Sequence, residues 1–174
     1  YELWKQSQSC AIMARLIARK VKFKKPEQAY IAGLLHDIGK VILNHYVTQQ
    51  YKVIMDKVEN ENKSFADAER EILGFDHSQI GAKLGEKWNF PPELVEAIEL
   101  HHTPEKSTIQ PVLVSIVHVA DAIVMMMGIG LGSDGMNYLF SDFALQTLQI
   151  DELQLQQLIS EGTDLLSDTE SFNI

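Results

Sequence analysis

Residues 32–40 read AGLLHDIGK, and the interpretation of the whole chain starts from this stretch. An apolar helical segment leads into His36 and Asp37, two adjacent residues that can both bind a metal. Histidine offers a neutral nitrogen, and aspartate offers a charged oxygen that can bridge two cations. Neighbours on a helix point about 100° apart, so both side chains can approach one ion from different directions. Alone, the pair is better explained as a buried helix end capped by Asp37, so a metal site requires further ligand-type residues.

The composition is that of a globular domain of 174 residues, with 45% hydrophobic and 22% charged residues. No apolar run approaches the roughly 18–20 residues that span a bilayer, and the start shows no signal-peptide pattern. The net charge of −9 argues against a nucleic-acid partner, which requires a concentrated basic surface. The single cysteine, Cys10, is interpreted as a core residue rather than a nucleophile. We therefore expect a cytoplasmic protein with neither a membrane nor a nucleic-acid partner.

Apolar periodicity and capping residues predict an all-α fold, because no run of alternating polarity is long enough for a strand. Ser64 and Asp76 each begin a capping-box pattern, and Pro26 and Pro111 suit the first turn of a helix. The pattern predicts one compact multi-helix domain over residues 1–174. Helices are expected over 4–20, 26–36, 41–57 (one or two helices), 65–73, a segment after Asp76, a segment from Pro91-Pro92 to His102, 112–127, 141–148 and 151–167.

Several finer expectations can be checked against a structure. Gly39 is expected to break or bend the helix that begins at Pro26. The expected core residues of the segment after it are Val41, Ile42, Val53, Ile54 and Met55. Residues 60–62 are predicted to form a polar loop, and residues 132–137 a turn-rich loop. The chain is expected to fray after Asp168.

Four further ligand-type residues lie downstream of His36 and Asp37. His77 follows a helix cap, and His101 and His102 close the helix that starts at the double proline. Asp121 lies in the middle of the most hydrophobic helix, where a carboxylate is costly to bury unless it is paired or bound to a cation. Each residue has a simpler explanation: His77 as a helix cap, the His-His pair as a surface turn, and Asp121 as an exposed residue beside His118. Six idle ligand-type residues together are harder to accept, so the pattern favours a metal site.

Six segments that contain these residues also carry a family resemblance. They are Leu3–Ser7, Ala32–Lys40, Glu69–Gly81, Lys87–Pro91, Ala97–His102 and His118–Ala122. In this order they resemble the HD superfamily of metal-dependent phosphohydrolases and, more closely, its HDOD branch of bacterial signalling domains.

The resemblance implies a centre for one or two divalent ions. His36, Asp37 and Asp121 would hold the first ion, and the second would be held by His77, His101 and His102, with Asp37 shared. Two adjacent ions can activate water and clamp a phosphoryl group. If the domain is active, Asp37 and Lys40 would be its catalytic residues, with Lys40 steadying phosphate charge; otherwise Lys40 is a solvated lysine. The sequence does not distinguish Mn, Fe, Mg, Zn or Ni.

Three departures from the family pattern bear on activity. Gln6 stands on the first helix where HD hydrolases usually carry a ligand, often histidine, and a neutral amide oxygen is a weaker ligand. Residues 103–105 read Thr-Pro-Glu, without the Gly-Tyr-Pro signature of the cyclic-dinucleotide phosphodiesterases. HDOD proteins commonly carry an additional helical segment before this region, and this sequence begins at Tyr1 without it.

Two functions follow from this pattern. The first is a signal-transduction output module with a retained divalent-metal site, which acts through a protein partner and does not catalyse a reaction. The alternative is a phosphohydrolase or phosphodiesterase that acts on a nucleotide or cyclic nucleotide ligand. The change at Gln6 and the missing signature favour the signalling module, whereas the six retained ligand-type residues and Lys40 favour the hydrolase.

Overall fold

The computed structural model describes residues 2–61, 63–129 and 140–171, and these segments are helical without a strand. No helix among them is long and apolar enough to cross a membrane. The elements are α1 (Glu2–Lys20), α2 (Pro26–Leu35), α3 (Ile38–Tyr46), α4 (Thr48–Glu61), α5 (Phe65–Leu73), α6 (His77–Lys87), α7 (Pro92–Leu100), the 3-10 helix η1 (Pro104–Lys106), α8 (Pro111–Met126), α9 (Asp142–Leu148) and α10 (Glu152–Ser171).

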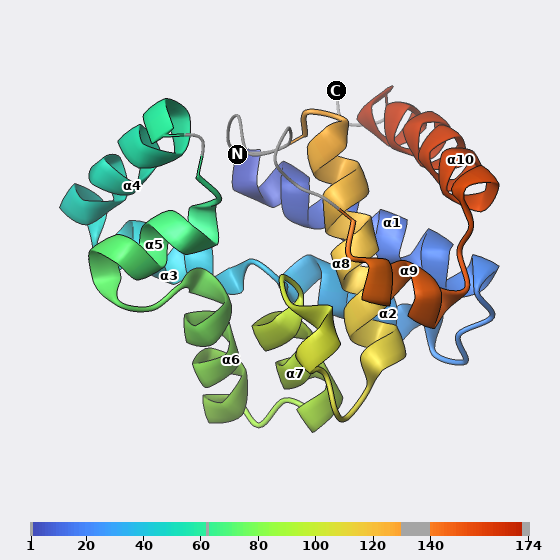
Figure 1. Cartoon of the computed structure of the whole chain (residues 1–174), viewed down its shortest axis with the longest axis horizontal. Helices are drawn as coiled ribbons and strands as arrows, with labels where there is room; N and C mark the ends of the chain where they lie inside the picture. The colour runs from blue at the N-terminus through green and yellow to red at the C-terminus, as the bar shows by residue number, and fades with distance from the viewer. Residues whose placement is uncertain (1, 62, 130–139, 172–174) are drawn as a thin grey trace.

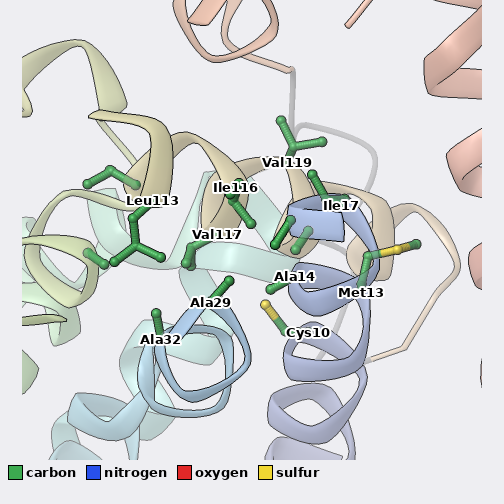
Figure 2. Close-up of a cluster of buried hydrophobic side chains, with 14 of the residues drawn as sticks. Cys10, Met13, Ala14, Ile17, Ala29, Ala32, Leu113, Ile116, Val117 and Val119 are labelled. Carbon is green, nitrogen blue, oxygen red and sulfur yellow. The ribbon is translucent and has the colours of Figure 1, made fainter. Parts of the chain in front are cut away.

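Helix α8 lies at the centre of the fold, against α1, α2, α7 and α9 (Figure 1). Every residue from Leu113 to Met125 is buried, as expected for a helix that is apolar on all sides. Figure 2 shows side chains of α1, α2 and α8 meeting in this main hydrophobic cluster. The all-α prediction is therefore confirmed, and α8 forms its structural core.

A second, smaller hydrophobic cluster lies under α4 and α5. Its buried members are Ile54, Val58, Phe65 and Ala68. In Figure 1, α4 and α5 lie at the opposite end of the molecule from α10. The described residues thus form two apolar clusters, and the connection between them involves α3 and α6.

The helix ends follow their local sequence signals. Ser64 Oγ accepts a hydrogen bond from the Asp67 amide, and Gly74 ends α5 at a φ of 82°. Asp76 and Gln79 form the full reciprocal capping box that begins α6. Prolines begin α2, α7, η1 and α8, as their missing amide hydrogen allows.

Three finer expectations are wrong. The break between α2 and α3 falls at His36 and Asp37, whereas Gly39 lies inside α3. Residues 60 and 61 belong to α4, and residue 62 lies outside the described residues, as do 132–137 and 172–174. Of the five expected core residues, Ile54 is buried and Ile42 and Met55 are partly buried. Val41 and Val53 are 48% and 46% exposed, because α3 and α4 turn other faces toward their neighbours.

Candidate metal centre

The break between α2 and α3 aims His36 and Asp37 into the protein. Both are buried, at 0% and 1% exposure. The Nδ1 atom of His36 donates to the Gly33 carbonyl oxygen at 2.7 Å, which orients the ring. Gly39 lets the start of α3 approach the start of α6, since a Cβ at this position would lie 1.8 Å from the His77 carbonyl oxygen. Close helix contact therefore brings Asp37 toward His77.

His77 is oriented by a carboxylate that lies one helix earlier. Glu69 Oε2 accepts hydrogen bonds from the His77 backbone amide at 2.8 Å and from its Nδ1 at 2.6 Å. The helix start is held as well, because Arg70 Nε donates to Asp76 Oδ2 at 2.7 Å. The Nε2 atom of His77 then faces the interior, 2.9 Å from His102 Nε2.

His101 and His102 stand at the end of α7, and Asp121 reaches the same place from α8. His101 Nδ1 donates to the Ile98 carbonyl oxygen at 2.8 Å. The His101 carbonyl in turn accepts from His118 Nδ1 at 2.8 Å, and His118 Nε2 accepts from the Ser141 amide at 3.0 Å. This imidazole bridge links the end of α7 to the residue that caps α9.

The two carboxylate oxygens of Asp37 face different histidines. Oδ2 lies 3.4 Å from His36 Nε2 and accepts from Lys40 Nζ at 2.8 Å. Oδ1 lies 3.2 Å from His77 Nε2 and 3.8 Å from His101 Nε2. A carboxylate placed in this way can bridge two cations, which is the role that the family resemblance implies for Asp37.

The hydrogen bonds set the chemical state of the ring nitrogens. Nδ1 of His36 and of His101 bonds a carbonyl oxygen, and Nδ1 of His77 bonds a carboxylate, so Nδ1 carries the hydrogen. In the neutral ring the Nε2 lone pair then faces the cluster. Histidines that bind metals are usually held by such a second hydrogen bond to a carbonyl or carboxylate.

Carboxylates make the centre favourable for positive charge. Burial raises the pKa of Asp37, but His36, Lys40 and His77 outweigh burial and hold this pKa well below its usual value. Burial also opposes ionisation of Asp121, yet His36 lowers the net pKa. Both residues are therefore ionised at neutral pH.

The histidines divide into two pairs. Burial lowers the pKa of His36, but Asp37, Cys10 and Asp121 raise it well above its ordinary value. Burial and Lys40 lower the pKa of His77, and Glu69 and Asp37 outweigh them, so the net pKa is raised. Burial, with repulsion from His36, lowers the pKa of His101 to about 3. Burial and His101 likewise hold the pKa of His102 well below its usual value.

Buried atoms without partners test whether a cation fits here. Asp37 Oδ1 and His101 Nε2 are buried and have no hydrogen-bond partner among the described residues. Such atoms are costly to bury unless something binds them. One donor atom from each of His77, His101 and His102 lies within 4.8 Å of the other two, and His36, Asp37 and His101 form a second such group. Imidazole and carboxylate donors at this spacing suit a divalent transition metal.

All six residues predicted as ligands are brought together by the structure. Asp121 is 3% exposed, with Oδ1 3.2 Å from His36 Nε2, so the alternative of an exposed Asp121 is wrong. Lys40 is only 6% exposed and bonded to Asp37, so it is not a solvated lysine. Gln6 also reaches the centre, where its Nε2 donates to Asp121 Oδ1 at 3.3 Å.

Two residues near the centre were not identified as site residues from the sequence. Glu69 is fully buried on the apolar face of α5, and its position one turn after Phe65 and Ala66 was a usable signal. Cys10 lies one helical turn after Gln6, and its Sγ is within 4.8 Å of donor atoms of His36 and Asp121. The i, i+4 spacing on the first helix could have placed Cys10 beside Gln6.

The fold and this cluster define the class: an all-α domain whose helices bring imidazoles and carboxylates to a buried centre that can bind a divalent metal. The model of the HDOD domain family matches residues 1–104, and the chain belongs to this family.

Several known proteins are similar to this chain in sequence or in structure. It is 33% identical to Ribonuclease Y of Geotalea uraniireducens over 114 residues, which are 66% of this chain and 15% of that protein. An HDOD domain protein of unknown function from Geobacter sulfurreducens superposes with a TM-score of 0.80 at 25% identity, over 95% of this chain and 59% of that one. A provisionally named phosphohydrolase from Shewanella amazonensis gives a TM-score of 0.73 at 23% identity, over 93% and 58% of the two chains. The chain thus spans about 15% of the length of its curated relative.

Proposed function

We propose that this chain is a signal-transduction output module of HDOD type in which a divalent-metal centre fastens the helices together. His36, Asp37 and Asp121 hold one ion, and His77, His101 and His102 hold a second, with Asp37 as the bridge. The observation that carries the proposal is the burial of the donor atoms, since only His102 among the six residues is more than slightly exposed. Buried donors of this kind suit an ion that holds helices together, whereas a catalytic ion needs a position that substrate can reach.

The centre joins the two hydrophobic clusters. Asp121 comes from α8 of the main cluster, whereas Glu69 comes from α5 of the smaller one and holds His77 in place. Lys40, bonded to Asp37, also lies 5.2 Å from the centre of the Phe65 ring in the smaller cluster. A bound cation therefore strengthens the attachment of α4 and α5 to the rest of the domain. A signal can act by making this attachment tighter or looser.

The partner that we propose is a protein. Val41, Tyr46 and Val53 expose apolar side chains on α3 and α4, next to the smaller cluster. Apolar side chains are common at protein interfaces, whereas the net charge of −9 disfavours a nucleic-acid backbone.

Metal analysis and amide hydrogen exchange test this function. Protein purified without chelator, or loaded with Zn²⁺ or Mn²⁺ and then desalted, should retain metal. Amides of residues 48–73 should exchange more slowly in the loaded protein than after chelation, because α4 and α5 are then held more firmly. Failure to retain either metal overturns the proposal, and so does retention with unchanged exchange in this segment.

A second candidate is a metal-dependent phosphohydrolase. Lys40 favours it, because a buried ammonium beside Asp37 is suited to stabilise the charge of a phosphoryl group. A divalent cation at this centre would act as a Lewis acid and lower the pKa of bound water. The names of Ribonuclease Y and of the Shewanella amazonensis protein agree with hydrolysis of phosphate esters.

Activity assays separate the two candidates. The Mn²⁺-loaded protein is incubated with bis(p-nitrophenyl) phosphate, a cyclic dinucleotide and a single-stranded RNA oligonucleotide. The signalling function predicts no turnover of any of them. Turnover that Asp37→Ala abolishes, and that Lys40→Ala reduces with metal content unchanged, establishes the hydrolase instead.

A further inference from the structure

Cys10 lies on the face of α1 that closes the candidate metal centre. It is fully buried, and Figure 2 shows its side chain extending from α1 toward α2. Close packing of these helices is possible because Gly33 leaves room, since a Cβ there would lie 2.8 Å from the Cys10 carbonyl oxygen. The Sγ atom of Cys10, one donor atom of His36 and one of Asp121 all lie within 4.8 Å of one another.

Gln6, a second buried polar residue of α1, turns its amide nitrogen toward Asp121. Its amide nitrogen donates to Asp121 Oδ1 and to Met125 Sδ, each at 3.3 Å. An amide nitrogen used in this way carries hydrogens and cannot bind a metal. The donor atom that α1 places near His36 and Asp121 is therefore the sulfur of Cys10, one turn further along.

The orphaned polar atoms described above provide an independent indication of a cation. His101 Nε2 and Asp37 Oδ1 are fully buried without a hydrogen-bond partner in the described segments. Both belong to the donor group that shares His36 with the Cys10 group. A cation at His36 is therefore supported by atoms other than the cysteine itself.

We propose that Cys10 binds, as a thiolate, the ion held by His36 and Asp121; this inference rests on the proposed metal centre. The thiol proton is released on binding, as ligation of a cysteine requires. Thiolate prefers Zn²⁺, Fe²⁺ or Co²⁺, whereas Mg²⁺ and Mn²⁺ prefer oxygen donors. Cys10 thus makes this half of the centre selective for the softer metals.

Cobalt absorption and X-ray absorption spectroscopy of the whole chain test this assignment. The Co²⁺-loaded protein should show a thiolate-to-cobalt charge-transfer band that Cys10→Ser removes. The Zn²⁺-loaded protein should show one sulfur at about 2.3 Å in addition to nitrogen or oxygen near 2.0–2.1 Å. Cys10→Ser should weaken Zn²⁺ binding by at least about tenfold and leave Mn²⁺ binding nearly unchanged.

Met13→Leu is the control, because it alters a buried residue of the same helix without touching the centre. This variant should keep the cobalt band and the Zn²⁺ affinity. Metal bound without a sulfur neighbour overturns the role of Cys10 and leaves the proposed function standing. Absence of any bound metal overturns both.

Discussion

Replacement of Glu69 by glutamine tests whether the centre depends on the carboxylate behind His77. Glu69 is fully buried, and one of its oxygens accepts from both the amide and the ring of His77. Glutamine retains the shape and one accepting oxygen but removes the charge. The variant therefore changes the electrostatics of the bond without leaving a cavity.

The expected loss of stability follows from the two bonds. A hydrogen bond to a charged group contributes about 1.5–3 kcal/mol and a neutral one about 0.5–1.5 kcal/mol, so two bonds lose about 2 kcal/mol. The new amide group replaces Oε1, which has no partner among the described residues, and its unsatisfied hydrogens add about 1 kcal/mol. The free energy of unfolding of the metal-free protein should therefore fall by about 3 kcal/mol. Metal affinity should fall about 10–100-fold, as when a carboxylate behind a ligating histidine is changed.

The assay is chemical denaturation of the metal-free protein, together with Zn²⁺ titration against a chromophoric chelator. Glu71→Gln is the matched control on the same helix, because Glu71 is exposed and pairs with Lys57 and Lys63 at the surface. The control should unfold at nearly the same denaturant concentration as the unmodified chain and bind Zn²⁺ normally. If Glu69→Gln binds Zn²⁺ as tightly as the unmodified chain, the proposed role of the carboxylate is refuted.

Three further predictions concern the same region. Gly39→Ala should destabilise the protein by about 3 kcal/mol or more in thermal or chemical denaturation, because the new Cβ would meet the His77 carbonyl. Gly74→Ala is the control, since Gly74 lies in open space at a positive φ and its replacement should cost only about 1 kcal/mol. Equal effects of the two variants would contradict this packing. Gln6→His should tighten Mn²⁺ binding about tenfold in a competition titration by adding a nitrogen beside Asp121, and an unchanged Kd would exclude this position as a ligand site. In denaturation experiments across pH, the metal-free protein should be most stable near pH 6.5, which is about the ordinary pKa of histidine. Above that pH, His36 and His77, whose pKa is raised by folding, lose protons that stabilise the folded state. Below it, the unfolded chain binds protons that His101 and His102, whose pKa is lowered by folding, do not bind. A monotonic stability profile would contradict the assignment.

The helix boundaries were predictable from sequence because their signals are local. Ser64 and Asp76 cap the helices that their spacing indicated, and Asp151 does the same through a reciprocal pair of bonds with Gln154. Where the outcome depended on distant packing, the prediction failed. Glycine weakens helices, which favours a break at Gly39, but this glycine allows a close contact with His77, which lies 38 positions away.

The candidate ligands were predictable for a similar reason. A carboxylate such as Asp121 does not fit the pattern of the strongly apolar helix around it, and this mismatch can be seen in the sequence alone. Glu69 shows the same mismatch more weakly, because α5 carries polar residues on its other faces. The sequence could not show that Cys10 and Asp121 approach the same imidazole, since this proximity exists only after α1 and α8 pack together.

Both ring nitrogens of His118 form hydrogen bonds with backbone groups that lie far apart in sequence, the carbonyl of His101 and the amide of Ser141. Neither neighbour can shift alone without breaking one of these two bonds. A shift of the His101 backbone carbonyl should therefore strain the bond that His118 accepts from Ser141, the residue that caps α9. The exchange rate of the Ser141 amide therefore reports on the position of the His101 backbone, 40 residues earlier in the chain.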